Sequence, residues 1–249
     1  MELTRLFPSP GVVDSAELLR DLGLGARAHG DRPYLVTNFA ATVDGRIAID
    51  GRSGAIGDDG DRELFRRLRT QADALLVGTG TIAQEEYSRP IRRADLRAAR
   101  EAIGLRPLPP LATVTRSGRL PLEVPLFHDP EAHVIVYTTV EIAPPAVPAR
   151  VELVRLEEGE RPLLTGALRD LRVARGIRSV LCEGGPALLG GLLRERLVDE
   201  LFLTVAPLLA GGGDAQPMTV GAALSAPQGL ALRWALERRG SLYLRYDVR

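Results

Sequence analysis

Residues 179–206 carry the clearest chemical signal in the sequence. A short apolar run of strand length is followed by Glu183, by two glycines (184–185) and by Pro186. Proline is tolerated in the first turn of a helix because the N–H that it lacks would have no partner there. The leucines that follow recur at helical spacing, and residues 201–206 form a second apolar run. The pattern predicts a strand, a glycine turn, a helix and a second strand.

This unit suits a ligand that carries phosphate. Glycines let a ligand approach the backbone, and the start of a helix offers free N–H groups and the positive end of its dipole. Glu183, at the predicted strand tip, is the candidate catalytic carboxylate. The candidate pyrophosphate contacts are Gly184, Gly185, Pro186, Ala187 and Leu188. Alone, a Gly-Gly pair is more typical of a plain tight turn, so the hypothesis depends on a second stretch.

That second stretch follows the apolar run 72–77, which reads as a buried strand. It brings glycines and hydroxyl groups to the strand's carboxyl end, where α/β folds bind ligands. Its candidate cofactor contacts are Gly78, Thr79, Gly80 and Thr81. By itself this stretch fits an ordinary strand end equally well. Two glycine loops of this kind together favour a dinucleotide.

A third candidate follows the predicted strand 111–115. Ser117 lies between Arg116 and Arg119, a grouping that suits an anion such as the 2′-phosphate of NADPH. A solvated loop is an equally good interpretation of these residues.

The composition excludes several classes of chemistry. The 249 residues include 32 arginines and no lysine, which rules out a lysine Schiff base and a P-loop lysine. One cysteine, Cys182, and three scattered histidines offer too few ligands for a zinc site, and no metal site is predicted. The formal net charge is zero, so nothing indicates a nucleic-acid or membrane partner. Without an apolar run of membrane length or a signal-peptide pattern, a cytoplasmic location is expected.

The succession of strand and helix patterns predicts a single α/β domain with a mixed sheet. Residues 1–32 are expected to form an N-terminal extension with one short helix, and residues 33–249 the main domain. We expect eight or nine strands and about four helices. The last two strands, 230–237 and 241–248, are expected to form an antiparallel hairpin at the sheet edge.

Three motifs together resemble the reductase domain of riboflavin biosynthesis. They are Phe39–Ala48 (FAATVDGRIA), Leu76–Thr81 (LVGTGT) and Cys182–Leu188 (CEGGPAL), the last followed by Leu197–Leu201 (LVDEL). The resemblance implies a dihydrofolate reductase-like, three-layer α/β/α fold with a central, mostly parallel sheet, a homodimer and NADPH as cofactor. It implies reduction of the ribosyl group of 5-amino-6-(5-phosphoribosylamino)uracil or a related ribosylaminopyrimidine. The sequence is similar to the stand-alone paralogues of high-GC actinobacteria.

By position, the resemblance also implies contacts outside the glycine loops. The implied cofactor contacts are Ala41, Ala55, Ile56, Thr81, Glu85 and the loop 185–191. The implied substrate contacts are Asn38, Ser53, Arg69, Arg92 and Glu183. On this basis Glu183 would accept hydrogen bonds from a pyrimidine or pterin, and Arg69 would pair with a substrate phosphate.

Several positions depart from the family pattern. Asn38 stands where a lysine is usual, Ala55 where a tryptophan is, and Gly57 where a threonine is; residues 85–90 replace an Asp-x-Pro-x-Leu-Thr segment. Most of these changes concern the substrate side. Two alternatives therefore remain open: reduction of dihydrofolate or another pterin, and an NADPH-binding protein without catalysis.

Overall fold

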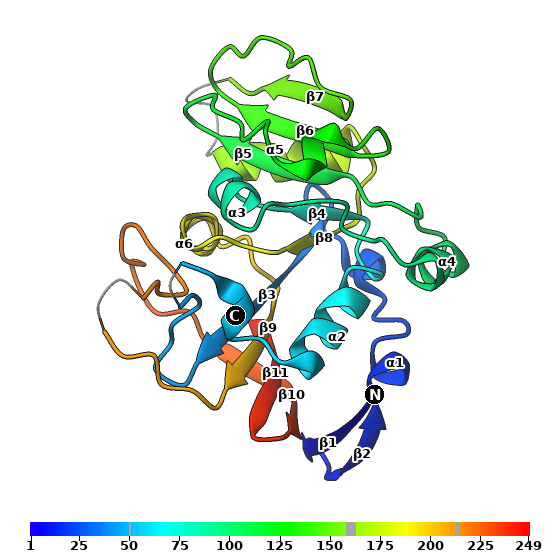
Figure 1. The fold of residues 1–249 in the computed structure, drawn as a ribbon, viewed down its shortest axis with the longest axis vertical. Coiled ribbons are helices and arrows are strands. Elements are labelled where there is room, and N and C mark those ends of the chain that lie inside the picture. The colour runs from blue at the N-terminus through cyan, green and yellow to red at the C-terminus, as the bar shows by residue number, and fades with distance from the viewer. Residues whose placement is uncertain (50, 158–162, 213–214) are drawn as a thin grey trace.

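The computed structural model describes residues 1–249 except 50, 158–162 and 213–214. The strands of this described part are β1 (Glu2–Phe7), β2 (Gly11–Asp14), β3 (Tyr34–Thr42), β4 (Ala74–Leu76), β5 (Leu111–Thr115), β6 (His133–Thr138), β7 (Arg150–Arg155), β8 (Ser179–Cys182), β9 (Glu200–Ala206), β10 (Leu230–Arg238) and β11 (Ser241–Val248). They form one eleven-stranded sheet in the order β2-β1-β10-β11-β9-β3-β8-β4-β5-β6-β7 (Figure 1). Pairing is antiparallel from β2 to β9 and parallel from β9 to β7.

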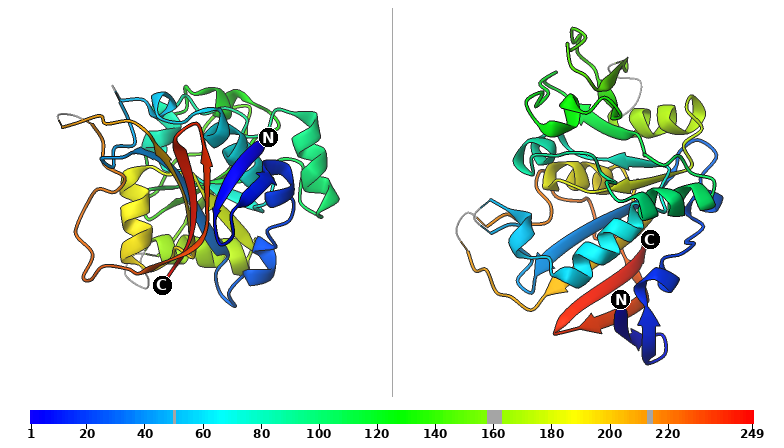
Figure 2. Two further views of the ribbon diagram at one scale, coloured as in Figure 1. Left: turned by 90° about the horizontal axis from the view of Figure 1, so that it is seen from below. Right: turned by 45° about the vertical axis from the view of Figure 1, so that its right-hand side comes forward.

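Helices cover both faces of this sheet (Figure 2). The α-helices are α1 (Ser15–Leu18), α2 (Asp59–Leu68), α3 (Thr79–Gln84), α4 (Ala94–Ala102), α5 (Leu163–Val173) and α6 (Pro186–Arg194). The short 3-10 helices are η1 (Leu24–Arg27), η2 (Ser53–Ala55) and η3 (Pro125–His128). The predicted single α/β domain with a mixed, mostly parallel sheet is confirmed.

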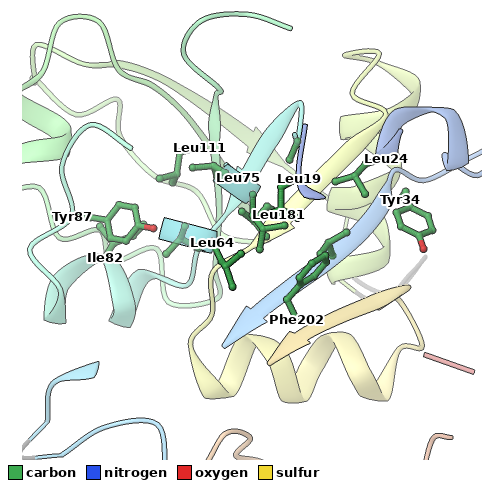
Figure 3. Packing of buried hydrophobic residues seen from close by; sticks show 14 of the residues in the cluster. Leu19, Leu24, Tyr34, Leu64, Leu75, Ile82, Tyr87, Leu111, Leu181 and Phe202 are labelled. Atoms are coloured by element: carbon green, nitrogen blue, oxygen red, sulfur yellow. The ribbon is translucent and has the colours of Figure 1, made fainter. Parts of the chain in front are cut away.

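Each face of the sheet has its own apolar core. On one face, leucines of α2 and Ile82 of α3 pack with Leu181 and Phe202 from the strands (Figure 3). On the other, α5 and α6 pack against Val180 and Cys182. Neighbouring residues of β8 thus enter opposite cores because successive side chains of a strand point to opposite faces. Burial on both faces explains why the strand is a continuous apolar run.

Helix α2 is fixed at its amino end by contacts with β11. Asp58 is its N-cap residue and accepts a hydrogen bond from the backbone N–H of Asp61 at 2.8 Å. The hydroxyl of Tyr243 donates to both carboxylate oxygens of Asp58, each at 2.8 Å. A Cβ at Gly60 would lie 2.1 Å from that hydroxyl, so the glycine leaves room for this contact.

At its carboxyl end, α2 is held by a buried arginine of α4. The guanidinium of Arg100, which is fully buried, donates to the carbonyl oxygens of Arg69 and Ala72, each at 2.6 Å. Burial lowers the pKa of Arg100 to about 10, still well above neutrality, so the group stays charged and can donate. Both ends of α2 are therefore held by hydrogen bonds, which fix the position of the helix and its side chains relative to the sheet.

Four local predictions from the sequence differ from the structure. The N-terminal segment contributes two strands, and β1 pairs with β10, so the C-terminal hairpin lies inside the sheet and not at its edge. The described part of the chain contains eleven strands and six α-helices, more than the eight or nine strands and about four helices expected. The second glycine stretch starts α3 instead of a loop.

Candidate functional site

Two adjoining cavities open where β4 and β8 end. The first, of about 370 Å³, lies beside α2 and is called the α2 cavity. The second, of about 460 Å³, lies beside the start of α6 and is called the α6 cavity. Both are lined by Thr81, Gln84, Gly185, Pro186 and Gln216. The carboxyl ends of neighbouring parallel strands meet here, as the sequence predicts for its two glycine stretches.

The α6 cavity brings those two stretches together. Its lining includes Gly78, Thr79, Gly80 and Thr81 from one stretch and Gly185, Pro186, Ala187 and Leu188 from the other. The N–H of Gly78 donates to the carbonyl oxygen of Gly184 at 2.8 Å, which ties the two loops directly. The peptide bond between Gly184 and Gly185 is cis.

The glycines of this cavity are needed for close approach. A Cβ at Gly185 would lie 2.6 Å from the hydroxyl oxygen of Thr81, and a Cβ at Gly78 would lie 3.3 Å from the backbone nitrogen of Gly185. Gly185 is also the N-cap residue of α6, whose first N–H groups have no partner within the helix. Arg116 and Arg194 line the same cavity and supply positive charge. A cradle of glycine backbone with two arginines fits the phosphates of a dinucleotide.

Glu183 and Arg69 form an ion pair in the α2 cavity. The guanidinium donates to both carboxylate oxygens of Glu183, at 2.6 and 2.8 Å, and the Glu183 side chain is only 1% exposed. Arg69 also donates to the carbonyl oxygen of Pro90 at 2.9 Å and to the hydroxyl of Tyr87 at 3.0 Å, and it lies over the ring of Phe65. The sequence predicted separate substrate contacts for the two residues. In the structure their charges neutralise one another.

Three further predicted contacts line the α2 cavity. Asn38, on β3, faces it, and Ser53 and Glu85 lie at its rim. The hydroxyl of Ser53 donates to the carboxylate of Glu85 at 2.8 Å, joining a predicted substrate contact to a predicted cofactor contact.

Other predicted contacts lie outside both linings. These are Ala41, Ala55, Ile56, Arg92, Ser117 and Gly184. Ala41 belongs to the core on the α5 and α6 side of the sheet, and Ile56 is buried. Arg92 donates to the hydroxyl of Ser88 at 2.5 Å on the surface.

Sequence reasoning predicted Arg69 but missed the other residues on the side of α2 that lines the α2 cavity, which is called the polar face of α2. Asp61, Phe65 and Arg69 stand four residues apart and all line the α2 cavity. This spacing places them on one side of a helix, so the signal was present in the sequence. Burial and the negative charge of Asp58 raise the pKa of Asp61 above its usual value.

Cys182 is a structural residue. Its thiol is fully buried beside the site, and burial raises its pKa to about 12. A thiol that stays protonated at neutral pH is a poor nucleophile. Among the described residues no group of histidine, cysteine and acidic side chains has the arrangement of a metal site. Nor does any described helix have the length and apolar character needed to span a membrane.

Comparison with known proteins agrees with the motifs. The family model described as RibD C-terminal domain matches residues 33–239. The chain is 32% identical over 186 residues to the 2,5-diamino-6-ribosylamino-4(3H)-pyrimidinone 5′-phosphate reductase of Archaeoglobus fulgidus, covering 74% of this chain and 84% of that protein. The reductase of the same name from Methanothermobacter thermautotrophicus is 31% identical, with 76% and 85% covered.

Solved structures share the fold. A pyrimidine reductase-like protein from Corynebacterium diphtheriae superposes with a TM-score of 0.74 at 24% identity, covering 88% of this chain and 93% of that chain. The riboflavin biosynthesis reductase Rib7 of Saccharomyces cerevisia superposes with a TM-score of 0.69 at 16% identity, covering 95% of this chain and 100% of that chain. The chain therefore belongs to the RibD C-terminal domain family, as its motifs predict.

Proposed function

We propose that the protein is a reductase of riboflavin biosynthesis that transfers a hydride from NADPH to the ribosyl group of a ribosylaminopyrimidine 5′-phosphate. One observation carries this proposal: a glycine-lined cavity adjoins a polar cavity, and the two share five lining residues. Hydride transfer needs the cofactor and the substrate side by side, and little more from the protein than their orientation.

The residues around the α6 cavity fit the cofactor. The backbone of Gly78 and Gly185 leaves space for a pyrophosphate, and the N–H groups at the start of α6 donate to it. Arg116 supports NADPH over NADH because its guanidinium suits a 2′-phosphate. When bound, the nicotinamide supplies the hydride. The residues shared between the two cavities would hold that ring beside the substrate.

On the substrate side, the Arg69–Glu183 pair gives the cavity a fixed carboxylate. Because Arg69 holds both of its oxygens, Glu183 is oriented before a substrate arrives, and its remaining lone pairs accept from amino or hydroxyl groups. Asn38 offers one donor and one acceptor nearby. Positioning of the substrate, and not attack by a side chain, is the contribution that we assign to Glu183.

The first alternative is reduction of dihydrofolate or another pterin. The departures at Asn38 and Gly57 favour a changed substrate, and both residues line the α2 cavity. The second alternative is an NADPH-binding protein that performs no reduction. The family resemblance also supports a homodimer in the cytoplasm, which the mass of the purified protein in solution would test in part.

Cofactor oxidation with two substrates separates these functions. We expect NADPH oxidation with the ribosylaminopyrimidine phosphate and none with dihydrofolate. We expect Glu183→Gln to lower kcat by roughly a hundredfold, within the range for loss of a positioned polar group, while the Kd for NADPH changes little. Glu17→Ala, which removes an exposed carboxylate near Arg20, serves as the control. Cofactor binding without turnover of either substrate would contradict the proposal.

A further inference from the structure

The α2 cavity has two chemically different ends. At one end of the polar face of α2, Arg69 is paired with Glu183. At the other end, Asp61 lies eight residues away, or about 12 Å along the helix axis. Thr81 and Gly185, which line both cavities, belong to the two glycine stretches, and Glu183 directly precedes one of these stretches. The Arg69–Glu183 end therefore adjoins the α6 cavity, whereas Asp61 lines the α2 cavity only.

The carboxyl group of Asp61 is placed by its neighbours. Its Oδ1 accepts a hydrogen bond from the hydroxyl of Thr204, on β9, at 2.7 Å. Its Oδ2 faces Gly57, where a Cβ would lie only 2.3 Å away. Gly57 therefore leaves room for this carboxyl group. Both residues line the cavity.

No arginine forms an ion pair with Asp61 within the part of the chain that the structure describes. Arg62, next in sequence, donates to the carboxylate of Asp59 at 3.2 Å and to the carbonyl oxygen of Gly54 at 3.3 Å. Asp61 has no ion-pair partner there within 4.0 Å. A partly buried carboxyl group without a cation calls for hydrogen-bond donors from elsewhere.

We propose that Asp61 recognises the pyrimidine ring of the substrate and selects a 2-amino-4-oxo ring over a 2,4-dioxo ring. The proposal rests on the proposed function and names the substrate class within it. The 2-amino group and the neighbouring ring N–H form an edge with two donors, which complements the two oxygens of a carboxylate. In the uracil ring a carbonyl oxygen replaces the amino group, so two acceptors would face each other.

The expected discrimination is large because a mismatched polar group is left unpaired. A hydrogen bond to a charged group contributes about 1.5–3 kcal/mol, which corresponds to roughly a tenfold to hundredfold preference. Asparagine at position 61 would keep one acceptor and replace the other with a donor. That pattern matches the N–H and carbonyl of a uracil edge, so the variant should turn the preference around.

The test compares kcat/KM for two substrates that differ only at ring position 2. They are 2,5-diamino-6-ribosylamino-4(3H)-pyrimidinone 5′-phosphate and 5-amino-6-(5-phosphoribosylamino)uracil. We expect the wild-type protein to prefer the first by about tenfold or more. Asp61→Asn should reverse this substrate preference, mainly through changes in KM. Asp59→Asn, which changes an exposed aspartate in the same turn of α2, should leave it unchanged.

Two results would overturn the inference while leaving the proposed function intact. One is a wild-type preference for the uracil substrate, and the other is an unchanged substrate ratio in Asp61→Asn. Dihydrofolate is the third substrate because pterins carry the same 2-amino-4-oxo edge. If the wild-type protein reduces only dihydrofolate and Asp61→Asn does not reduce it, the result supports recognition of the ring by Asp61 but contradicts the proposed ribosyl substrate. Inactivity towards all three would refute both.

Discussion

Gly185→Val is expected to abolish binding of the nicotinamide cofactor. The new side chain would begin 2.6 Å from the Thr81 hydroxyl oxygen, and valine adds two methyl groups at the start of α6. Those groups would fill the space that we assign to the pyrophosphate and cover the free N–H groups of the first helical turn. A loss of about 3 kcal/mol or more, roughly a hundredfold in Kd, is expected.

Fluorescence titration with NADPH measures this loss. Gly30→Val is the matched control because a Cβ at Gly30 has no heavy atom within 4 Å and the residue lies outside both cavities. The control should bind NADPH like the wild type. Unchanged binding by folded Gly185→Val would show that the pyrophosphate lies elsewhere.

Glu200→Ala is expected to cause the largest loss of stability. The carboxylate of Glu200, at the start of β9, is fully buried and accepts two hydrogen bonds from Arg245, both at 2.9 Å. It also accepts from the hydroxyl of Tyr34 at 3.0 Å and pairs with Arg27. Burial, together with the charge of Glu200, raises the pKa of Tyr34 to about 12, so this hydroxyl keeps its proton at neutral pH.

Removing Glu200 leaves the Arg245 guanidinium, whose side chain is 10% exposed, without its counter-charge. Removing one partner of a buried ion pair lowers the free energy of unfolding by about 3–5 kcal/mol. For a chain of this size, Tm should therefore fall by on the order of 10 °C. Thermal unfolding followed by circular dichroism measures the change. Glu17→Ala removes only an exposed pair with Arg20, at 3.9 Å, and should leave Tm nearly unchanged. Equal Tm values for the two variants would show that the buried network does not stabilise the fold.

Local signals in the sequence were sufficient for the central part of the fold. The apolar run 179–182 marks the strand, the two glycines permit the turn and Pro186 favours the first turn of a helix, so this unit could be predicted without knowing the rest of the chain. The N-terminal strands could not be predicted. In β1 only Leu3 is buried, so no alternating pattern marks this strand, and pairing with β10 determines it.

The candidate site also combines features that local sequence signals mark with features that depend on contacts between distant segments. The glycine loops were predicted because each is continuous in sequence. The pairing of Arg69 with Glu183 was missed because the two residues are 114 positions apart and meet only through the packing of α2 on the sheet. Asp61 was missed although its spacing from Arg69 is helical. The leucines of α2 dominate its periodicity, and they mark the face towards the core.

Hydride transfer itself is tested most directly with isotope-labelled cofactor. NADPH carrying deuterium at both C4 positions of the nicotinamide is incubated with the protein and 2,5-diamino-6-ribosylamino-4(3H)-pyrimidinone 5′-phosphate, and the product is examined by mass spectrometry. The account predicts a ribityl product that carries one deuterium from the cofactor, and greatly reduced labelling with Gly185→Val. A protein that binds NADPH yet forms no labelled ribityl product would contradict it.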